Sequence, residues 1–112
     1  MLNQIILVGR LVSDPEIKET KSGKKVGTIT LAVSRSYKNS NGIYETDFVP
    51  VALWNGIAEN TAEYCKKGDM VGIKGKIESS TTADDWQTID ENKKMKLRVI
   101  AEKVTFLSSK RS

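Results

Sequence analysis

Aromatic side chains are the residues of this sequence whose types and spacing predict chemistry. Phe48 and Trp54 are six residues apart on a run that is otherwise mostly aliphatic. Alternate side chains of a strand share a face, so both rings are expected on one face, while Val49, Val51 and Leu53 fill a core on the other. Flat rings on an exposed strand stack against the faces of nucleobases. The expected chemistry is therefore non-covalent stacking.

Two tyrosines lie on either side of a turn just upstream. Asn41-Gly42 is a dipeptide typical of two-residue β-hairpins, and Tyr37 and Tyr44 flank it. A hairpin centred on this dipeptide places both tyrosines on one face. The two tyrosines therefore join the expected stacking residues.

Basic residues are clustered rather than evenly spread. The chain has 18 Lys and Arg against 14 Asp and Glu, a formal net charge of +4. One cluster crowds a turn at residues 18–25, and a second begins a strand at residues 93–98. A basic cluster alone is usually a solvated surface, but beside aromatic rings it favours a polyanionic partner.

The composition argues against an enzyme. The chain contains no histidine and a single cysteine, Cys65, so it lacks a metal-binding cluster, an intramolecular disulfide and the usual nucleophile–base pairs. It also lacks a glycine-rich phosphate loop. No cofactor, metal or small-molecule substrate is expected. The apolar run at residues 5–8 is too short for a signal peptide or membrane span, so we expect a soluble protein of the reducing cytoplasm.

Strand periodicity positions these residues. Apolar or alternating runs bounded by turn residues predict five strands, at residues 4–12, 26–33, 45–54, 70–80 and 94–107. After the third strand the apolar period becomes helical, with Asn55 as the expected N-cap and Gly68 beyond the helix. Pro50 cannot donate a ladder hydrogen bond, so it is expected at an edge, a bulge or an unpaired position. Residues 81–93 are expected to form a polar loop, and residues 108–112 a frayed end.

Three strands, a short helix and two further strands are the element order of the five-stranded OB barrel. We therefore predict an all-β domain over residues 1–107, an OB-fold barrel with one short helix between strands three and four. A sheet with a helix packed on one face is the alternative. Alternation in the last two strands places Val71, Ile73, Leu97 and Val99 inward and Ile100 outward. In an OB barrel, strands two and three and two neighbouring loops form the usual ligand face.

Six segments together resemble bacterial and phage single-stranded DNA-binding proteins. They are NQIILVGRL at 3–11, DPE at 14–16, ITLAV at 29–33, DFVPVALW at 47–54, AEN at 58–60 and YCKKG at 64–68. The resemblance extends over residues 1–107. It implies an OB fold, a homotetramer, with a dimer as the alternative, and single-stranded DNA wound over the subunits by stacking and phosphate contacts.

The resemblance also implies roles for single residues. The family's stacking aromatics correspond to Tyr37, Phe48 and Trp54, and a helix residue near its subunit contacts corresponds to Tyr64. Cations are expected to contact phosphates. The family's basic contacts correspond loosely to Arg10, Lys74 and Lys76, with Arg35 and Lys25 nearby, and the basic run before the last strand adds Lys96 and Arg98.

Two regions depart from the family pattern. The family commonly has another stacking aromatic with flanking arginines near the end of strand four, where this chain reads ESSTT at 78–82. Trp86 is expected to take over that stacking role, although four acidic residues between positions 84 and 91 would repel phosphate. The sequence stops at Ser112 without the family's acidic, hydrophobic tail tip. It thus resembles a tailless or truncated member, and recruitment of partners through such a tail is not expected.

The expected function is sequence-independent binding and protection of single-stranded DNA in replication, recombination and repair, at the nucleoid or replication fork. Two alternatives stay open. One is a primosomal or recombination accessory protein of the same fold that binds DNA as a dimer. The other is a protein-interaction module whose exposed aromatics form the interface.

Overall fold

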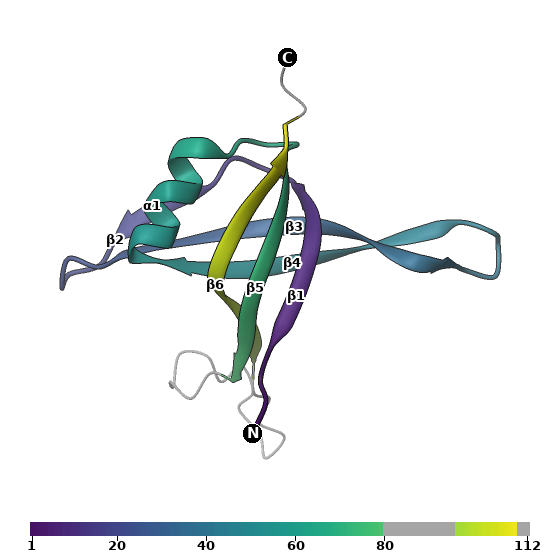
Figure 1. Ribbon diagram of the computed structural model, residues 1–112, viewed down its shortest axis with the longest axis horizontal. Helices are drawn as coiled ribbons and strands as arrows, with labels where there is room; N and C mark the ends of the chain where they lie inside the picture. The colour runs from purple at the N-terminus through teal and green to yellow at the C-terminus, as the bar shows by residue number, and fades with distance from the viewer. Residues whose placement is uncertain (80–95, 110–112) are drawn as a thin grey trace, which may run out of the picture.

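One β-sheet closes on itself to form a barrel in this computed structural model, which describes residues 1–79 and 96–109 (Figure 1). The strands are β1 (Ile5–Leu11), β2 (Glu16–Glu19), β3 (Lys25–Lys38), β4 (Tyr44–Trp54), β5 (Met70–Ser79) and β6 (Leu97–Ser108). Their order in the sheet is β1-β5-β6-β4-β3-β2, and additional pairing between β1 and β3 closes the ring. Five strands therefore form the barrel and β2 extends its β3 edge. This architecture confirms the predicted all-β barrel.

The barrel interior is filled by the apolar side chains that the alternation predicts. Leu31, Val51, Leu53 and Val71 have no exposed surface, and Ile73 is 1% exposed. Each follows the period-two pattern of its strand, so the face of the sheet that points into the barrel is buried at these positions. Burial of this face provides the main free energy that holds the barrel together.

The last strand departs from the prediction at two positions. Leu97, expected inside, is 69% exposed, and Ile100, expected outside, is only 8% exposed. Leu97 is the first residue of β6 and pairs with Ser79, the last residue of β5, so it lies at the end of the ladder. Ile100 lies between its register partners Ala52 of β4 and Lys76 of β5, in the middle of the sheet.

Close backbone approach explains two of the strand glycines. A Cβ on Gly9 would lie 2.6 Å from the carbonyl oxygen of Ala32, and one on Gly75 would overlap the carbonyl oxygen of Ile100. Both glycines lie where neighbouring strands bend tightly around the small barrel. A side chain at either position would push the strands apart. The predicted bend or close contact at Gly9 is thus confirmed.

The strand β2 and the start of the helix differ from prediction. Residues 16–19 contain one apolar residue, Ile17, too few for a recognisable alternation, yet they pair with β3 from Glu16↔Thr28 to Glu19↔Lys25.

Helix α1 runs over Asn55–Tyr64, between β4 and β5 as predicted. Asn55 is not its N-cap: Trp54 holds that position without a side-chain cap, and Asn55 has φ +50°. At ten residues, α1 is too short to cross a membrane, and no helix in the described ranges meets that requirement.

The β3–β4 hairpin extends beyond the barrel as a two-stranded arm (Figure 1). Its turn is longer than the predicted two residues. The Asn39 N–H donates to the Ile43 carbonyl at 2.8 Å, and the Asn39 side-chain oxygen accepts from the N–H groups of Asn41 and Ile43. Gly42 has φ +76°, which favours glycine. The register shifts between Ser34 and Lys38, so the arm contains a bulge at its base.

The ends of the chain lie close to their predicted bounds. β6 continues to Ser108, inside the segment expected to fray, and residues 110–112 lie outside the described residues. The predicted polar loop at 81–93 also lies outside them, as does Trp86.

Candidate nucleic-acid interface

A row of cross-strand neighbours runs over the outer face of the barrel. Register places Glu16 beside Thr28, Thr28 beside Ala52, Ala52 beside Ile100 and Ile100 beside Lys76, so the row crosses β2, β3, β4, β6 and β5. Thr28 and Ala52 in its middle have small side chains. Small residues between longer ones leave a depression in the outer face.

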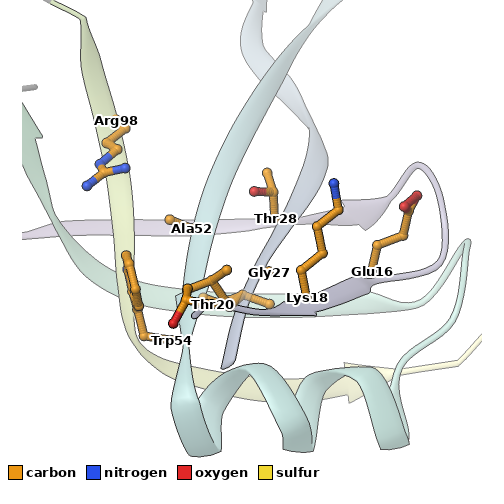
Figure 2. A pocket seen from close by; sticks show the side chains of 10 residues that line it. Glu16, Lys18, Thr20, Gly27, Thr28, Ala52, Trp54 and Arg98 are labelled. Carbon is orange, nitrogen blue, oxygen red and sulfur yellow. The ribbon is translucent and has the colours of Figure 1, made fainter. Parts of the chain in front are cut away.

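This depression is a groove of about 440 Å³ beside Trp54, here called the Trp54 groove (Figure 2). Trp54 pairs with Val26 of β3, which pairs in turn with Lys18 of β2. The indole of Trp54 is partly exposed and forms one wall of the groove, with Arg98 of β6 beyond it (Figure 2). The groove is lined by Glu16, Lys18, Thr20, Val26, Gly27, Thr28, Ala52, Leu53, Trp54 and Arg98.

A second hollow of about 370 Å³ adjoins the first. Trp54 and Arg98 line both, and Lys24 and Lys76 line the second together with Asn55, Glu78 and Ile100. Trp54 and Arg98 therefore line two adjoining depressions, both of which also have lysines in their walls. Of Lys18, Lys24, Lys76 and Arg98, only Lys76 forms an ion pair with another described residue, to Glu78 at 3.2 Å.

Phe48 lies further along β4 on the same outer face as Trp54, as predicted. Its side chain is 65% exposed and its register partner is Ala32, which pairs on its other side with Arg10 of β1. Pro50, between the two rings, pairs with Thr30 without a shift in register, and the β4–β6 ladder begins only after it. The proline therefore leaves the alternation of β4 intact.

The two tyrosines of the arm lie on different faces, so the prediction that they share one is wrong. Tyr44 pairs with Lys38 and shares the face of Phe48, whereas Tyr37, next to Lys38, points to the opposite face. The longer turn and the bulge change the register that a two-residue turn would give. Both rings are exposed, Tyr37 by 62% and Tyr44 by 56%, and the Lys38 Nζ lies 5.5 Å from the Tyr44 ring centroid.

The predicted phosphate contacts are spread over the barrel. Arg98 and Lys76 lie at the Trp54 groove and its neighbouring hollow. Lys25, at the start of β3, lies 3.3 Å from Glu19 in an exposed ion pair. Lys74 is exposed on β5 beside Ile6, away from these hollows, and Lys96 is exposed just before β6. Arg10 Nη1 donates to the Gly68 carbonyl at 3.1 Å.

Arg35 differs from the other basic residues because carboxylates surround its guanidinium. Its Nε and Nη2 donate to Asp47 at 2.9 to 3.2 Å, and its Nη1 lies 3.4 Å from Glu45. The hydrogen bonds and the charge of Asp47 raise the pKa of Arg35, and the hydrogen bonds from Arg35 lower the pKa of Asp47. Both shifts favour the charged forms of Arg35 and Asp47.

Two groove cations were not assigned a role from the sequence. Lys18 and Lys24 belong to the basic cluster at residues 18–25, but only the pairing of β2 with β3 places them around Trp54. The signal available was the lysine cluster itself, since four lysines lie within residues 18–25.

The model of the single-strand binding protein family matches residues 2–107. The chain belongs to this family. Membership confirms the resemblance seen in the sequence, and it confirms a DNA-binding type of protein rather than an enzyme, because proteins of the single-strand binding family are non-enzymatic.

Curated relatives support the assignment to the single-strand binding family. Single-stranded DNA-binding protein B of Bacillus subtilis is 51% identical over 79 residues, which cover 70% of each chain. Single-stranded DNA-binding protein 1 of Clostridium acetobutylicum is 40% identical over 111 residues, covering 98% of this chain and 97% of that protein. Single-stranded DNA-binding protein 2 of Listeria monocytogenes is 40% identical, covering 98% of this chain and 66% of its own length.

A solved structure confirms the fold. The crystal structure of wild-type single-stranded DNA binding protein from Thermus aquaticus superposes with a TM-score of 0.78 at 24% identity. The alignment covers 97% of this chain and 52% of that one, so this chain spans about half the length of the Thermus protein. The barrel of this single-strand binding family member is thus an OB fold, as predicted.

Proposed function

We propose that the protein binds single-stranded DNA irrespective of sequence, by stacking bases on the rings of the outer face and pairing phosphates with the cations beside them. The observation that supports this best is the position of Trp54 between two depressions lined by Lys18, Lys24, Lys76 and Arg98. A flat ring flanked by cations matches the alternation of base and phosphate along a nucleic-acid strand.

The physics of stacking explains the lack of sequence selectivity. Each base stacked on an aromatic side chain contributes about 1 to 3 kcal/mol, and every base has a π face. Duplex DNA hides those faces within its own stack, so single strands are preferred. Phosphate contacts make the affinity depend on salt, because each neutralised phosphate releases counterions.

Several residues share the two roles in this proposal. Stacking falls to the exposed rings of β4 and the arm, namely Trp54, Phe48, Tyr44 and Tyr37, with Trp86 as a further stacking residue outside the described ranges. Phosphate contacts fall to Arg10, Lys18, Lys24, Lys25, Lys74, Lys76, Lys96 and Arg98. Such binding protects single strands exposed in replication, recombination and repair, at the nucleoid or replication fork in the cytoplasm.

The protein is further proposed to assemble as a homotetramer through β1. Residues 5–8 pair with β5 on one side and with no other described strand on the opposite side. Ile6 and Val8 on this strand are 69% and 50% exposed. An open strand edge with exposed apolar side chains is suited to pairing with another copy. Mass photometry at nanomolar concentration measures the assembly, and a monomer as the main species would contradict it.

The DNA-binding proposal is tested by measuring the anisotropy of labelled oligo-dT at low salt. The double variant Phe48→Ala with Trp54→Ala removes two rings of the outer face and should weaken binding at least tenfold, since two stacked bases are together worth about 2 to 6 kcal/mol. Tyr64→Ala is the matched control, because Tyr64 is also an exposed aromatic but lies on α1 beside Phe106; since its position corresponds to the family's subunit contacts, mass photometry verifies that this variant keeps the wild-type assembly. Equal affinity of the double variant and the wild type would refute the stacking role.

A further inference from the structure

The base of the β3–β4 arm contains a three-residue charged cluster formed by Arg35, Asp47 and Glu45. All three guanidinium nitrogens of Arg35 face carboxylate oxygens, at 2.9 to 3.4 Å. Each of the three nitrogens thus has a carboxylate partner, and the guanidinium charge is shared between Asp47 and Glu45. A phosphate approaching Arg35 would have to displace a carboxylate or add a third anion to the cluster.

The cluster joins the two strands where their register pairing is interrupted. Ser34 pairs with Thr46, and the next register pair is Lys38 with Tyr44, so no pair is formed by residues 35–37 of β3. The Arg35 side chain spans this bulge and reaches both Glu45 and Asp47 of β4. It provides the cross-strand contact that the bulge removes. The bulge determines the direction in which the arm leaves the barrel.

The cluster also determines the charge next to a stacking residue. Alternation places Arg35, Tyr37 and the two carboxylates on one face of the arm. One guanidinium and two carboxylates give this cluster a formal charge of −1. Without Arg35 the charge would be about −2, and a DNA backbone passing Tyr37 would meet stronger repulsion.

We propose that Arg35 is a positioning residue, which holds the arm across its bulge and neutralises Asp47 and Glu45 beside Tyr37, and that it is not a phosphate ligand. This inference rests on the proposed binding of single-stranded DNA. It replaces the phosphate contact that the sequence led us to expect at this position.

Four proteins other than the wild type test the proposal. Arg35→Gln removes the cation, and Asp47→Asn removes one carboxylate. The double variant has the same net charge as the wild type, and its two amide side chains keep hydrogen-bonding groups facing each other. Lys66→Gln is the matched control, because it removes one positive charge from an exposed residue after α1. Labelled oligo-dT is titrated at several salt concentrations, and thermal unfolding verifies that each variant is folded.

The positioning role predicts a pattern that a phosphate ligand would not produce. Arg35→Gln should bind about three- to fivefold more weakly at low salt, the size expected for exposed charge pairs, and the difference should shrink as salt screens the repulsion. The double variant should bind within about twofold of the wild type, and Lys66→Gln should behave as the wild type. Asp47→Asn should bind at least as tightly as the wild type.

Two outcomes overturn the proposal. If Arg35 is a phosphate ligand, the double variant stays as weak as Arg35→Gln and both lose about 0.7 from the salt slope. If Arg35→Gln binds as the wild type does, Arg35 has no role in binding. Absence of oligo-dT binding by the wild-type protein would instead refute the proposed function, so the two failures are distinguishable.

Discussion

Removing the unpaired cations around Trp54 should reduce the salt dependence of binding by a calculable amount. The perturbation is the triple variant Lys18→Ala, Lys24→Ala, Arg98→Ala. These three residues line the two depressions beside Trp54 and form no ion pair with described residues, so their charges are available to phosphates. Lys76 is left in place because Glu78 already balances it.

The expected magnitude follows from counting phosphates. Each contributes about 0.7 to the slope of log affinity against log salt on single strands, so three contribute about 2. Between about 50 and about 200 mM salt the wild type should therefore lose about 20-fold more affinity than the triple variant. At the lower salt concentration the triple variant should already bind more weakly.

The assay is anisotropy of labelled oligo-dT at four or more salt concentrations. The double variant Lys66→Ala with Lys67→Ala is the control, because these exposed lysines lie in the turn after α1, away from the Trp54 groove. Its slope should equal that of the wild type. If the triple variant also retains the wild-type slope, these cations do not neutralise phosphates and the role assigned to the groove is wrong.

Three further predictions concern stability. Gly9→Ala should destabilise the fold by about 1 to 3 kcal/mol, since the added Cβ would meet a backbone carbonyl of β3. Gly72→Ala should be neutral or stabilising, because no atom lies closer than 3.7 Å to the Cβ it would add, and urea unfolding of both variants distinguishes the two cases. Leu53→Ala should lose about 2 to 5 kcal/mol, because Leu53 is fully buried, and a smaller loss by chemical denaturation would contradict its central position. Arg35 lowers the pKa of Asp47 in the folded protein, so their ion pair stabilises the fold at pH values above the pKa of Asp47 in the unfolded chain. This stabilisation is lost as the pH falls through the pKa of Asp47 in the folded protein. Asp47→Asn should therefore flatten the acid side of the curve of stability against pH, measured by thermal unfolding.

The shared outer face of the two β4 rings was predictable because a strand alternates its side chains with a fixed period of two. Phe48 and Trp54 lie on the opposite face of β4 from Val51 and Leu53, and this alternation of faces continues through Pro50. The helix was likewise predictable from a change of period. These properties are local, so a single sequence contains them.

Features that depend on contacts between distant residues were not predictable. The turn at the tip of the arm depends on the Asn39 side chain, which accepts from two backbone N–H groups and replaces the two-residue turn. The role of Arg35 depends on which residues of β4 the bulge brings opposite it. The strand β2 forms because β3 offers a partner, since its own four residues contain too little apolar surface to predict a strand.

The two open edges of the sheet differ in a way that limits how copies of the protein join. β2 ends the sheet order and is four residues long, with Glu16, Lys18 and Glu19 on it. A short, charged edge discourages addition of a further strand and so protects against fibrous aggregation. The free part of β1 instead exposes Ile6 and Val8. When this edge pairs across a twofold axis, neither copy keeps a free β1 edge, so strand addition stops at a pair and the proposed tetramer needs a second, different contact surface; an assembly of this kind is closed rather than an open-ended filament.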